Sequence, residues 1–260
     1  MATDEQLKYL YDEAYKFLES KIGKEVLEQK LKYQRYYKAE TMIDVYWHML
    51  QSLCNKRGMP ASIGPIDVLE SFYFDFDPLK THEQYGDDWK KLFKIIKKNY
   101  TPPGPMDISK PNSYWAIFCR GSLSGAAFLA KFESFDMFDK FVGSFTFNHL
   151  SIAALALLIE HEIYGMGFPL AGDWLKGCGY SNYGKSDVHT QGILYDAGML
   201  EKNDSFECFK LMARIGKLVG QPVAIVDKLL WWIGSGKYVN DGEKVTRHRK
   251  EFIEILKQRI

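Results

Sequence analysis

Cysteine is scarce in this chain of 260 residues, and its spacing argues against several kinds of site. The four cysteines lie far apart, with no CxxC pair: Cys54, Cys119, Cys178 and Cys208. Disulfide scaffolds, zinc sites and cysteine-ligated iron–sulfur clusters need paired or closely spaced cysteines. There is no phosphate-binding loop and no metal-ligand cluster in the sequence either. We therefore expect free thiols in a reducing compartment, with no metal and no cofactor.

Long apolar runs and a large net charge are missing as well. The most apolar stretch, 152–159, is far shorter than the roughly 20 residues that span a bilayer. The charged N-terminus, MATDEQLKYLYDEA, does not have the pattern of a signal peptide. The formal net charge is +1, so any basic surface must be local. We expect a cytoplasmic protein, associated with the nucleoid if its cell is prokaryotic, with no membrane partner.

Apolar and aromatic residues, in contrast, recur at helical spacing along almost the whole chain, which predicts an all-α protein. The expected helices span 4–21, 25–54, 87–99, 113–131, 135–147, 150–163, 187–199, 205–219, 222–235 and 243–258. Among them, the apolar helix 150–163 is expected at the centre of the core, with Asn148 as its N-cap. Residues 55–65 are expected to form a loop. The segment 71–78, SFYFDFDP, alternates like a strand but has no partner run, so we expect an irregular connection or a short helix ending.

Proline and glycine mark a linker at 101–105 (TPPGP), because neither residue continues a helix. We place a domain boundary there. Residues 1–105 are expected to form an N-terminal helical region that packs into both lobes, and 106–260 to form the core.

Basic residues stand out in two of the expected helices. Five lysines share one face of the helix at 87–99: Lys90, Lys91, Lys94, Lys97 and Lys98. They form either a solvated face or a stripe that contacts phosphates. Arg120 lies in the otherwise apolar helix at 113–131, so it must find a partner or a groove.

The stretch from Tyr164 to His189, YGMGFPLAGDWLKGCGYSNYGKSDVH, contains a turn at Gly165-Met166-Gly167 followed by a helix. Pro169 suits the start of that helix, where its missing N–H costs nothing. Such a turn leaves amide N–H groups at a positive helix end, which suits a phosphate oxygen. The alternative is a plain helical hairpin whose glycines only permit tight packing.

The segment GMGFPLAGDWL followed by DVH resembles the helix-hairpin-helix DNA glycosylases, the endonuclease III-like superfamily. Gly165, Gly167, Ala171, Asp187 and His189 fit the hairpin of that family and its V-D-T-H-like segment, over about 35 residues. The resemblance implies a two-lobed helical glycosylase-like fold with the helix-hairpin-helix motif at about 150–180. The cysteine cluster that many relatives use for iron–sulfur is absent, which implies a divergent member without the cluster.

The resemblance also implies roles for single residues. Asp187 would stabilise the positive charge that builds up on the sugar and orient the attacking water, although a plain helix N-cap is the alternative. Phosphate contacts would come from four residues: Gly165, Gly167, Leu170 and Lys185. Relatives that also nick the strand have a lysine two residues after the second hairpin glycine, where this chain has Pro169. The resemblance therefore implies an enzyme that leaves an intact abasic site, with Lys176 and Lys185 as the remaining candidates for lyase chemistry.

A glycosylase must also hold the extruded base between flat or apolar side chains. Our candidates for this pocket are Tyr114, Trp115, Lys228, Trp231 and Trp232, and Arg120 is a candidate for a wedge or a phosphate contact. The alternative is that these aromatic residues belong to the core.

Together these patterns predict a monofunctional DNA N-glycosylase. It would act as a monomer on double-stranded DNA with a flipped, damaged or modified base, in repair or in defence against DNA with modified bases. Two alternatives stay open. One is a catalytically inert helix-hairpin-helix module that binds DNA, and the other is a helical interaction protein with no role in nucleic-acid binding.

Overall fold

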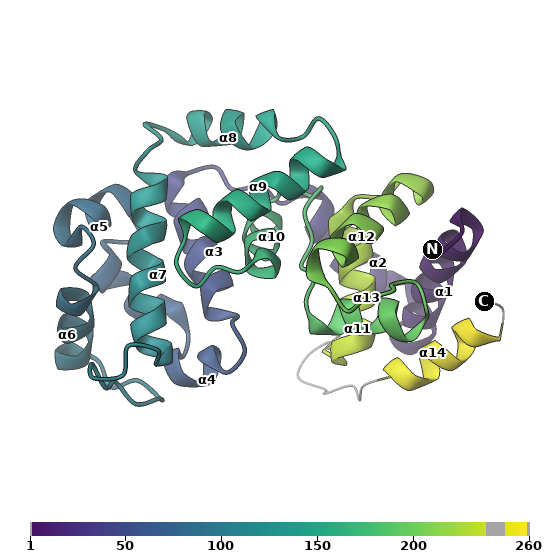
Figure 1. The fold of residues 1–260 in the computed structure, drawn as a ribbon, viewed down its shortest axis with the longest axis horizontal. Helices are drawn as coiled ribbons and strands as arrows, with labels where there is room; N and C mark the ends of the chain where they lie inside the picture. The colour runs from purple at the N-terminus through teal and green to yellow at the C-terminus, as the bar shows by residue number, and fades with distance from the viewer. Residues whose placement is uncertain (1, 238–247, 259–260) are drawn as a thin grey trace. The chain divides into compact units, whose positions relative to one another are not determined.

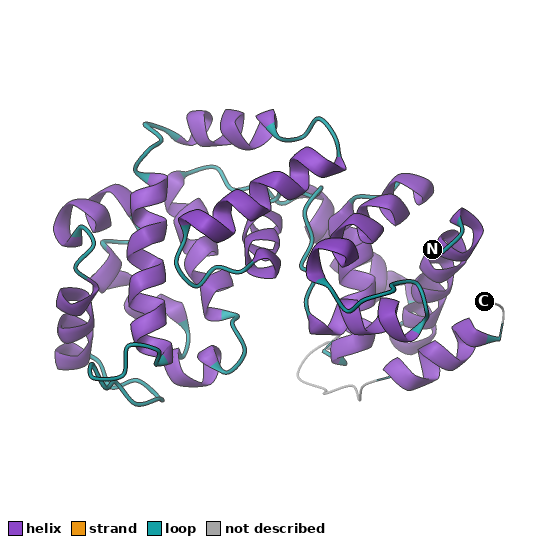
Figure 2. Ribbon diagram, viewed as in Figure 1, coloured by secondary structure: helices purple, strands orange, loops and turns teal. Residues whose placement is uncertain are grey.

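The computed structural model describes residues 2–237 and 248–258, and within them every regular element is helical (Figures 1 and 2). The all-α prediction is confirmed. The elements are α1 Asp4–Ile22, α2 Lys24–Tyr36, α3 Met42–Cys54, α4 Met59–Ile63, the 3₁₀ helix η1 Ile66–Tyr73, α5 Pro78–Tyr85, α6 Trp89–Asn99, α7 Tyr114–Leu129, α8 Phe135–Ser144, α9 His149–Glu162, α10 Phe168–Gly177, α11 Val188–Asp196, α12 Ser205–Val219, α13 Val223–Ser235 and α14 Arg249–Lys257. No helix in these ranges has both the length and the apolar character needed to cross a membrane.

The internal contacts divide the chain into two compact units. One unit, here called the terminal unit, comprises Met1–Tyr37 and Gly179–Ile260, and the other, the central unit, comprises Lys38–Cys178. This division differs from the boundary that we expected at 105. The segment 101–105 is not a linker between units, because the Gly104 N–H donates a hydrogen bond of 3.0 Å to the Ser62 carbonyl oxygen, within the central unit. The first 105 residues contribute helices to both units.

Helix α13 forms the core of the terminal unit. Its sequence, VAIVDKLLWWIGS, is buried along nearly its whole length, and it packs against α1, α2, α11, α12 and α14. Glycine permits the closest of these approaches, since a Cβ atom at Gly234 would lie 2.9 Å from the backbone oxygen of His189 in α11. The start of α11 is thereby held against the C-terminal half of α13.

Helix α7 has the corresponding place in the central unit, where it packs against α3, α4, α5, α6 and α9 (Figure 1). It carries the small residues Gly121 and Gly125 on buried faces. A Cβ atom at Gly121 would lie 2.6 Å from the backbone oxygen of Tyr164. The N–H of Tyr164 in turn donates a hydrogen bond of 2.9 Å to Ser124 Oγ. The turn between α9 and α10 is therefore seated directly on α7.

Two expectations for the first half of the chain need correction, and a third is confirmed. The helix expected at 25–54 is two helices, because Thr41 starts α3 with a reciprocal capping pair that involves Asp44. The expected loop at 55–65 contains the short helix α4. At 71–78 the structure has the expected helix ending and irregular connection. Helix η1 ends at Tyr73, and Phe74, Asp75 and Phe76 all have positive φ angles before α5 begins.

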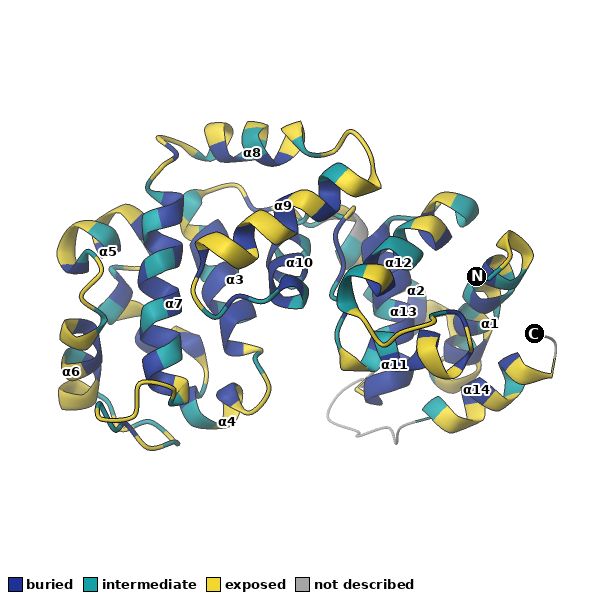
Figure 3. Cartoon of the chain, viewed as in Figure 1, coloured by how far each residue is buried: buried dark blue, intermediate teal, exposed yellow. Residues whose placement is uncertain are grey.

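Helix α9 is not the central core element that its apolar sequence predicted. Asn148 does cap it, as expected, but one side of the helix is exposed, as the yellow stretches of α9 in Figure 3 show. Leu150, Leu157 and Leu158 retain 55%, 37% and 36% of their exposure. Its position in the core is taken by α7. The helix expected at 243–258 begins at Arg249, and residues 243–247 lie outside the described ranges.

Candidate functional site

Asp187 begins α11, and both of its carboxylate oxygens accept hydrogen bonds. Oδ1 accepts from the backbone N–H groups of His189 at 2.9 Å and Thr190 at 3.4 Å. These bonds satisfy two of the amides that a helix start leaves without partners. Oδ2 accepts from Nε1 of Trp231 in α13 at 3.2 Å. The carboxylate is thus held in one orientation by two helices while it stays partly exposed.

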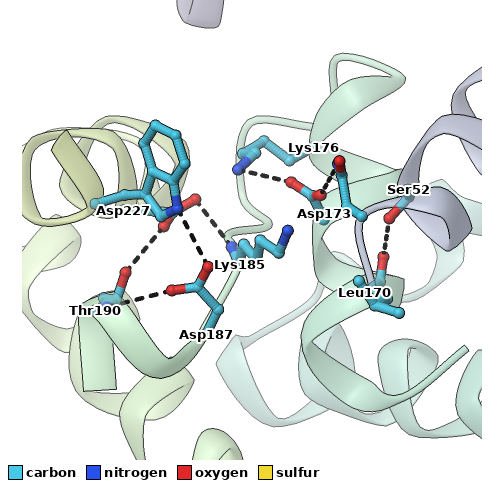
Figure 4. Close-up of polar contacts among 10 residues, drawn as sticks. Ser52, Leu170, Asp173, Lys176, Lys185, Asp187, Thr190 and Asp227 are labelled. Atoms are coloured by element: carbon cyan, nitrogen blue, oxygen red, sulfur yellow. Dashed lines mark hydrogen bonds and ion pairs between the residues drawn. The ribbon is translucent and has the colours of Figure 1, made fainter. Parts of the chain in front are cut away.

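Asp227, a residue that our sequence reasoning overlooked, supports the segment that carries Asp187. It is completely buried in α13. Its Oδ2 accepts a hydrogen bond of 2.9 Å from the Lys185 N–H, and its Oδ1 accepts one of 3.4 Å from Thr190 Oγ1 (Figure 4). Gly184 permits this contact, because a Cβ atom there would lie 3.1 Å from Asp227 Cβ. The signal in the sequence was a lone acidic residue in a mostly apolar helix.

Flat and cationic side chains lie near this carboxylate. The imidazole of His189 packs edge-on against Trp231, with 6.3 Å between ring centroids. Lys228 Nζ lies 5.1 Å from the centroid of the Trp231 ring and 5.8 Å from that of Trp232. Trp231 is partly exposed, whereas Trp232 is buried. Adjacent residues of a helix point about 100° apart, so only the first of the two tryptophans reaches Asp187.

The turn with the two glycines joins α9 to α10 in the central unit. The two positions differ in whether the fold requires glycine there. Gly165 has a φ angle of +77°, and a Cβ atom there would lie 2.9 Å from Ile117 Cγ2, so this position needs glycine. Gly167 has a φ angle of −73°, and no heavy atom would lie closer than 3.9 Å to its Cβ. The fold itself therefore does not require glycine at 167. Neither amide has a hydrogen-bond partner within the described ranges.

Leu170, which we expected to contact a phosphate, is buried and its backbone groups are already hydrogen-bonded. Its N–H donates to the Gly167 carbonyl oxygen at 2.8 Å, its side chain is buried, and its carbonyl accepts a hydrogen bond of 2.7 Å from Ser52 Oγ (Figure 4). Leu170 thus anchors α10 to α3.

Two of the expected pocket residues belong to the central unit and pack there. Trp115 is fully buried, and its Nε1 donates a hydrogen bond of 3.1 Å to the Ser62 carbonyl oxygen. It is a core residue, as the alternative interpretation held. Tyr114 is 39% exposed and lies against Gly58, where any side chain would collide with its hydroxyl. Asp187 belongs to the other unit.

The position two residues after Gly167 is occupied by Pro169, in the first turn of α10. Of the two lysines considered as substitutes, Lys176 pairs with Asp173 at 3.1 Å, and its side chain is only 10% exposed (Figure 4). Asp173 also accepts a hydrogen bond of 3.0 Å from Asn55 Nδ2. Burial in this ion pair leaves Lys176 poorly placed to attack a sugar. Lys185 is partly exposed and lies two residues before Asp187.

The possible metal ligands and the thiols can be located in the part of the chain that the structure describes. No cluster of three or more His, Cys, Asp or Glu residues that could hold a metal ion occurs in the part of the chain that is described. The four cysteines are buried free thiols. Burial raises the pKa of Cys54 to about 11, and it raises the pKa of Cys208 as well, with Asp227 and Asp187 adding to that effect. Such thiols stay protonated at neutral pH and are weak nucleophiles.

A comparison with known proteins identifies the fold class of this chain. No family model matches the chain, and no curated protein sequence matches it. A solved structure that resembles it is that of the Methanocaldococcus jannaschii 8-oxoguanine glycosylase/lyase in complex with 15mer DNA containing 8-oxoguanine. The TM-score is 0.50 at 13% sequence identity, and the likeness covers 87% of this chain and 98% of that one. The chain therefore has the all-helical fold of a DNA glycosylase. At this identity the likeness establishes the fold, and the chemistry must be argued from the site.

Proposed function

We propose that this protein is a monofunctional DNA N-glycosylase of the helix-hairpin-helix superfamily, without an iron–sulfur cluster. The observation that carries the proposal is the fixed, partly exposed carboxylate of Asp187, held by the start of α11 and by Trp231. Cleavage of an N-glycosidic bond builds positive charge on the sugar as the base leaves. A carboxylate that is oriented in advance stabilises that charge without reorganising during the reaction.

The hydrogen bonds of Asp187 are compatible with this role. A carboxylate offers about four acceptor positions, and three hydrogen bonds are made here, so Oδ2 can still accept a proton from an attacking water. The ring of Trp231 and the ammonium group of Lys228 supply a flat surface and a hydrogen-bond donor for an extruded base. The base pocket that we propose is therefore smaller than the sequence suggested, with Trp231 and Lys228 as its members.

The hairpin supplies the proposed DNA contact. The amides of Gly165 and Gly167 lie at the start of α10, where a helix favours anions. Gly167 has the backbone angles of an ordinary residue, and a Cβ there would make only ordinary contacts at 3.9 Å, with Glu160 Oε1 and Pro169 Cδ. A backbone that a phosphate approaches closely is one reason for glycine at such a position. We propose that a monomer binds double-stranded DNA through this hairpin.

Strand nicking is not part of the proposal. The resembling archaeal enzyme is a glycosylase/lyase, but this chain has Pro169 at the hairpin position where a lysine would form a Schiff base. Lys176 is held by Asp173. The expected product is therefore an intact abasic site.

The test is a panel of duplexes that each contain one modified base, including 8-oxoguanine, uracil, alkylated purines and enlarged pyrimidines, followed by alkali to cleave abasic sites. DNA from phages with modified bases extends the panel and separates a defence role from a repair role. We expect base release from at least one substrate, with no strand cleavage before alkali. Absence of base release across the panel, in a protein that binds duplex DNA, would contradict the proposal.

A second candidate is an inert DNA-binding module with the same hairpin. The observation in its favour is that Asp187 caps α11, which by itself accounts for Oδ1. An N-cap role does not account for the hydrogen bond from Trp231 Nε1 to Asp187 Oδ2. Base release that depends on the Asp187 carboxylate would decide between the two candidates.

A further inference from the structure

Arg120 lies between two aromatic rings that belong to different parts of the central unit. Its guanidinium carbon is 4.6 Å from the ring centroid of Trp89, the first residue of α6, and 5.3 Å from that of Tyr164, in the turn after α9. Nη1 also donates a hydrogen bond of 3.2 Å to Tyr164 Oη. Cation–π contacts and one hydrogen bond therefore hold the guanidinium, while most of its five N–H donors have no partner within the described ranges.

Helix α6 presents an uncompensated basic face. Its apolar residues Leu92, Phe93 and Ile96 are buried, and its five lysines are all exposed: Lys90, Lys91, Lys94, Lys97 and Lys98. None of the five makes an ion pair with any residue that the structure describes. Four other exposed lysines of the same unit are paired, Lys38, Lys80, Lys110 and Lys131, whereas Lys140 is exposed and no ion pair of it is seen with the described residues. Two aspartates precede α6, and one of them, Asp88, caps it, so the lysines remain in excess.

The basic face and the hairpin are connected by contacts. Lys90 Nζ lies 5.9 Å from the centroid of the same Trp89 ring that Arg120 covers. Lys90, Trp89, Arg120 and Tyr164 therefore form a continuous row, which we call the α6–hairpin row, from the start of α6 to the turn that contains Gly165.

We infer that the α6–hairpin row, together with Lys94 and Lys97, is a second nucleic-acid contact surface that takes the phosphodiester backbone. The inference deepens the proposed function and rests on it, because it extends the DNA contact from the hairpin onto α6. The chemistry fits a phosphate chain. The lysines are spaced at one helical turn without competing carboxylates on α6, and the planar guanidinium of Arg120 presents several donors at once. The exposed Tyr164 ring suits stacking against a base.

The experiment measures how the full-length protein binds a fluorescent duplex that contains a stable abasic-site analogue, over a range of salt concentrations. Three variants are compared with the unaltered protein: the triple variant Lys90→Ala/Lys94→Ala/Lys97→Ala, Arg120→Gln, and the matched control Lys80→Ala/Lys110→Ala/Lys131→Ala. The control removes the same charge from the same unit, at lysines that are already paired. Thermal unfolding is followed for each variant.

For the triple variant we expect affinity to fall at least about tenfold near 100 mM salt, and the slope of log affinity against log salt to decrease in magnitude by about 2 to 3. Arg120→Gln should lower affinity and reduce the slope by about 1. The affinity of the control variant should stay within about twofold of that of the unaltered protein, because its three lysines are paired with carboxylates and are not part of the proposed surface. Since all six lysines are exposed or paired at the surface, we expect folded proteins throughout.

Three results would overturn the inference. If the triple variant binds with the affinity and slope of the unaltered protein, the α6 surface does not contact DNA, while the proposed function stands. If the unaltered protein shows no salt-dependent duplex binding, the proposed function fails and the inference fails with it. If polyglutamate displaces the duplex as well as unlabelled DNA of equal charge does, the surface accepts any polyanion and does not select nucleic acid.

Discussion

Nε1 of Trp231 donates a hydrogen bond of 3.2 Å to Oδ2 of Asp187, across the contact between α13 and α11. If this bond fixes the catalytic orientation of the carboxylate, Trp231→Phe should slow base release by about 10- to 100-fold, since a hydrogen bond to a charged group is worth about 1.5–3 kcal/mol. The measurement is single-turnover base release with enzyme in excess, on the substrate that the panel identifies.

Trp115→Phe is the matched control for that variant. It also removes one indole N–H bond, to the Ser62 carbonyl oxygen, but in the core of the central unit. We expect it to lower the free energy of unfolding by about 2 kcal/mol, because it leaves a small cavity and removes one of the two hydrogen bonds that the Ser62 carbonyl oxygen accepts. Its rate of base release should match that of the unaltered protein. Equal rates for Trp231→Phe and the unaltered protein would mean that the bond has no catalytic role.

Asp187→Asn should slow base release by at least about 100-fold while duplex binding persists, because it removes the negative charge that faces the developing cation. Asparagine is as good an N-cap as aspartate, so the start of α11 should remain intact. Asp204→Asn provides the comparison, since Asp204 caps α12 of the same unit by accepting from the Glu207 N–H at 2.9 Å. An Asp187→Asn variant that releases base at the rate of Asp204→Asn would remove Asp187 from the mechanism and favour the inert module.

The two hairpin glycines should respond differently to alanine. Gly165→Ala should lower the free energy of unfolding by about 1–2 kcal/mol, because a positive φ angle disfavours alanine and its Cβ would meet Ile117. Gly167→Ala should change it by less than about 0.5 kcal/mol, since its backbone angles and surroundings accept a methyl group. If a phosphate approaches the 167 amide, the second variant should nevertheless bind a duplex about tenfold more weakly.

Urea unfolding and fluorescence anisotropy separate these two effects. A Gly167→Ala variant with unchanged stability and unchanged affinity would show that the hairpin glycines serve packing alone. That was the alternative that the sequence left open.

Pro169 should decide whether the reaction stops at the abasic site. With borohydride present, the unaltered protein should form no covalent adduct with a duplex that contains an abasic site, because the hairpin position lacks an amine. Pro169→Lys should gain such an adduct, detectable as a shifted band on a denaturing gel. If the unaltered protein is trapped and Lys185→Ala is not, Lys185 supplies the amine and the enzyme is a lyase.

Apolar patterns were the most reliable guides in the sequence. They located α1, α6 and α12 to within a residue or two, because each helix has a clear apolar face; in the structure each also begins at a capping side chain, Thr3, Asp88 and Asp204. They failed where two helices follow each other closely. Residues 25–54 have a continuous pattern, and only the capping pair at Thr41 separates α2 from α3.

The candidate site residues also differ in whether the sequence could identify them. Asp187 could be found because its spacing from the hairpin glycines is a local property of the chain, and its position as a helix N-cap follows from the same few residues. Trp115, Trp231 and Trp232 could not be distinguished, since an aromatic residue in a helix packs inward or outward according to what lies opposite. The structure buries Trp115 and Trp232 and leaves Trp231 beside the carboxylate.

The sequence by itself determined the helical class, most helix starts, and the hairpin with its glycines and Pro169, since short-range spacing and backbone preferences decide all of these. Only the tertiary structure decided which distant segments meet. It placed the buried Asp227 under Lys185 and Thr190, and Trp231 against Asp187. It also divided the chain at 37–38 and 178–179 instead of at the proline-rich segment. The physical reason is that burial and hydrogen bonding between remote residues depend on how helices pack, which no local pattern encodes.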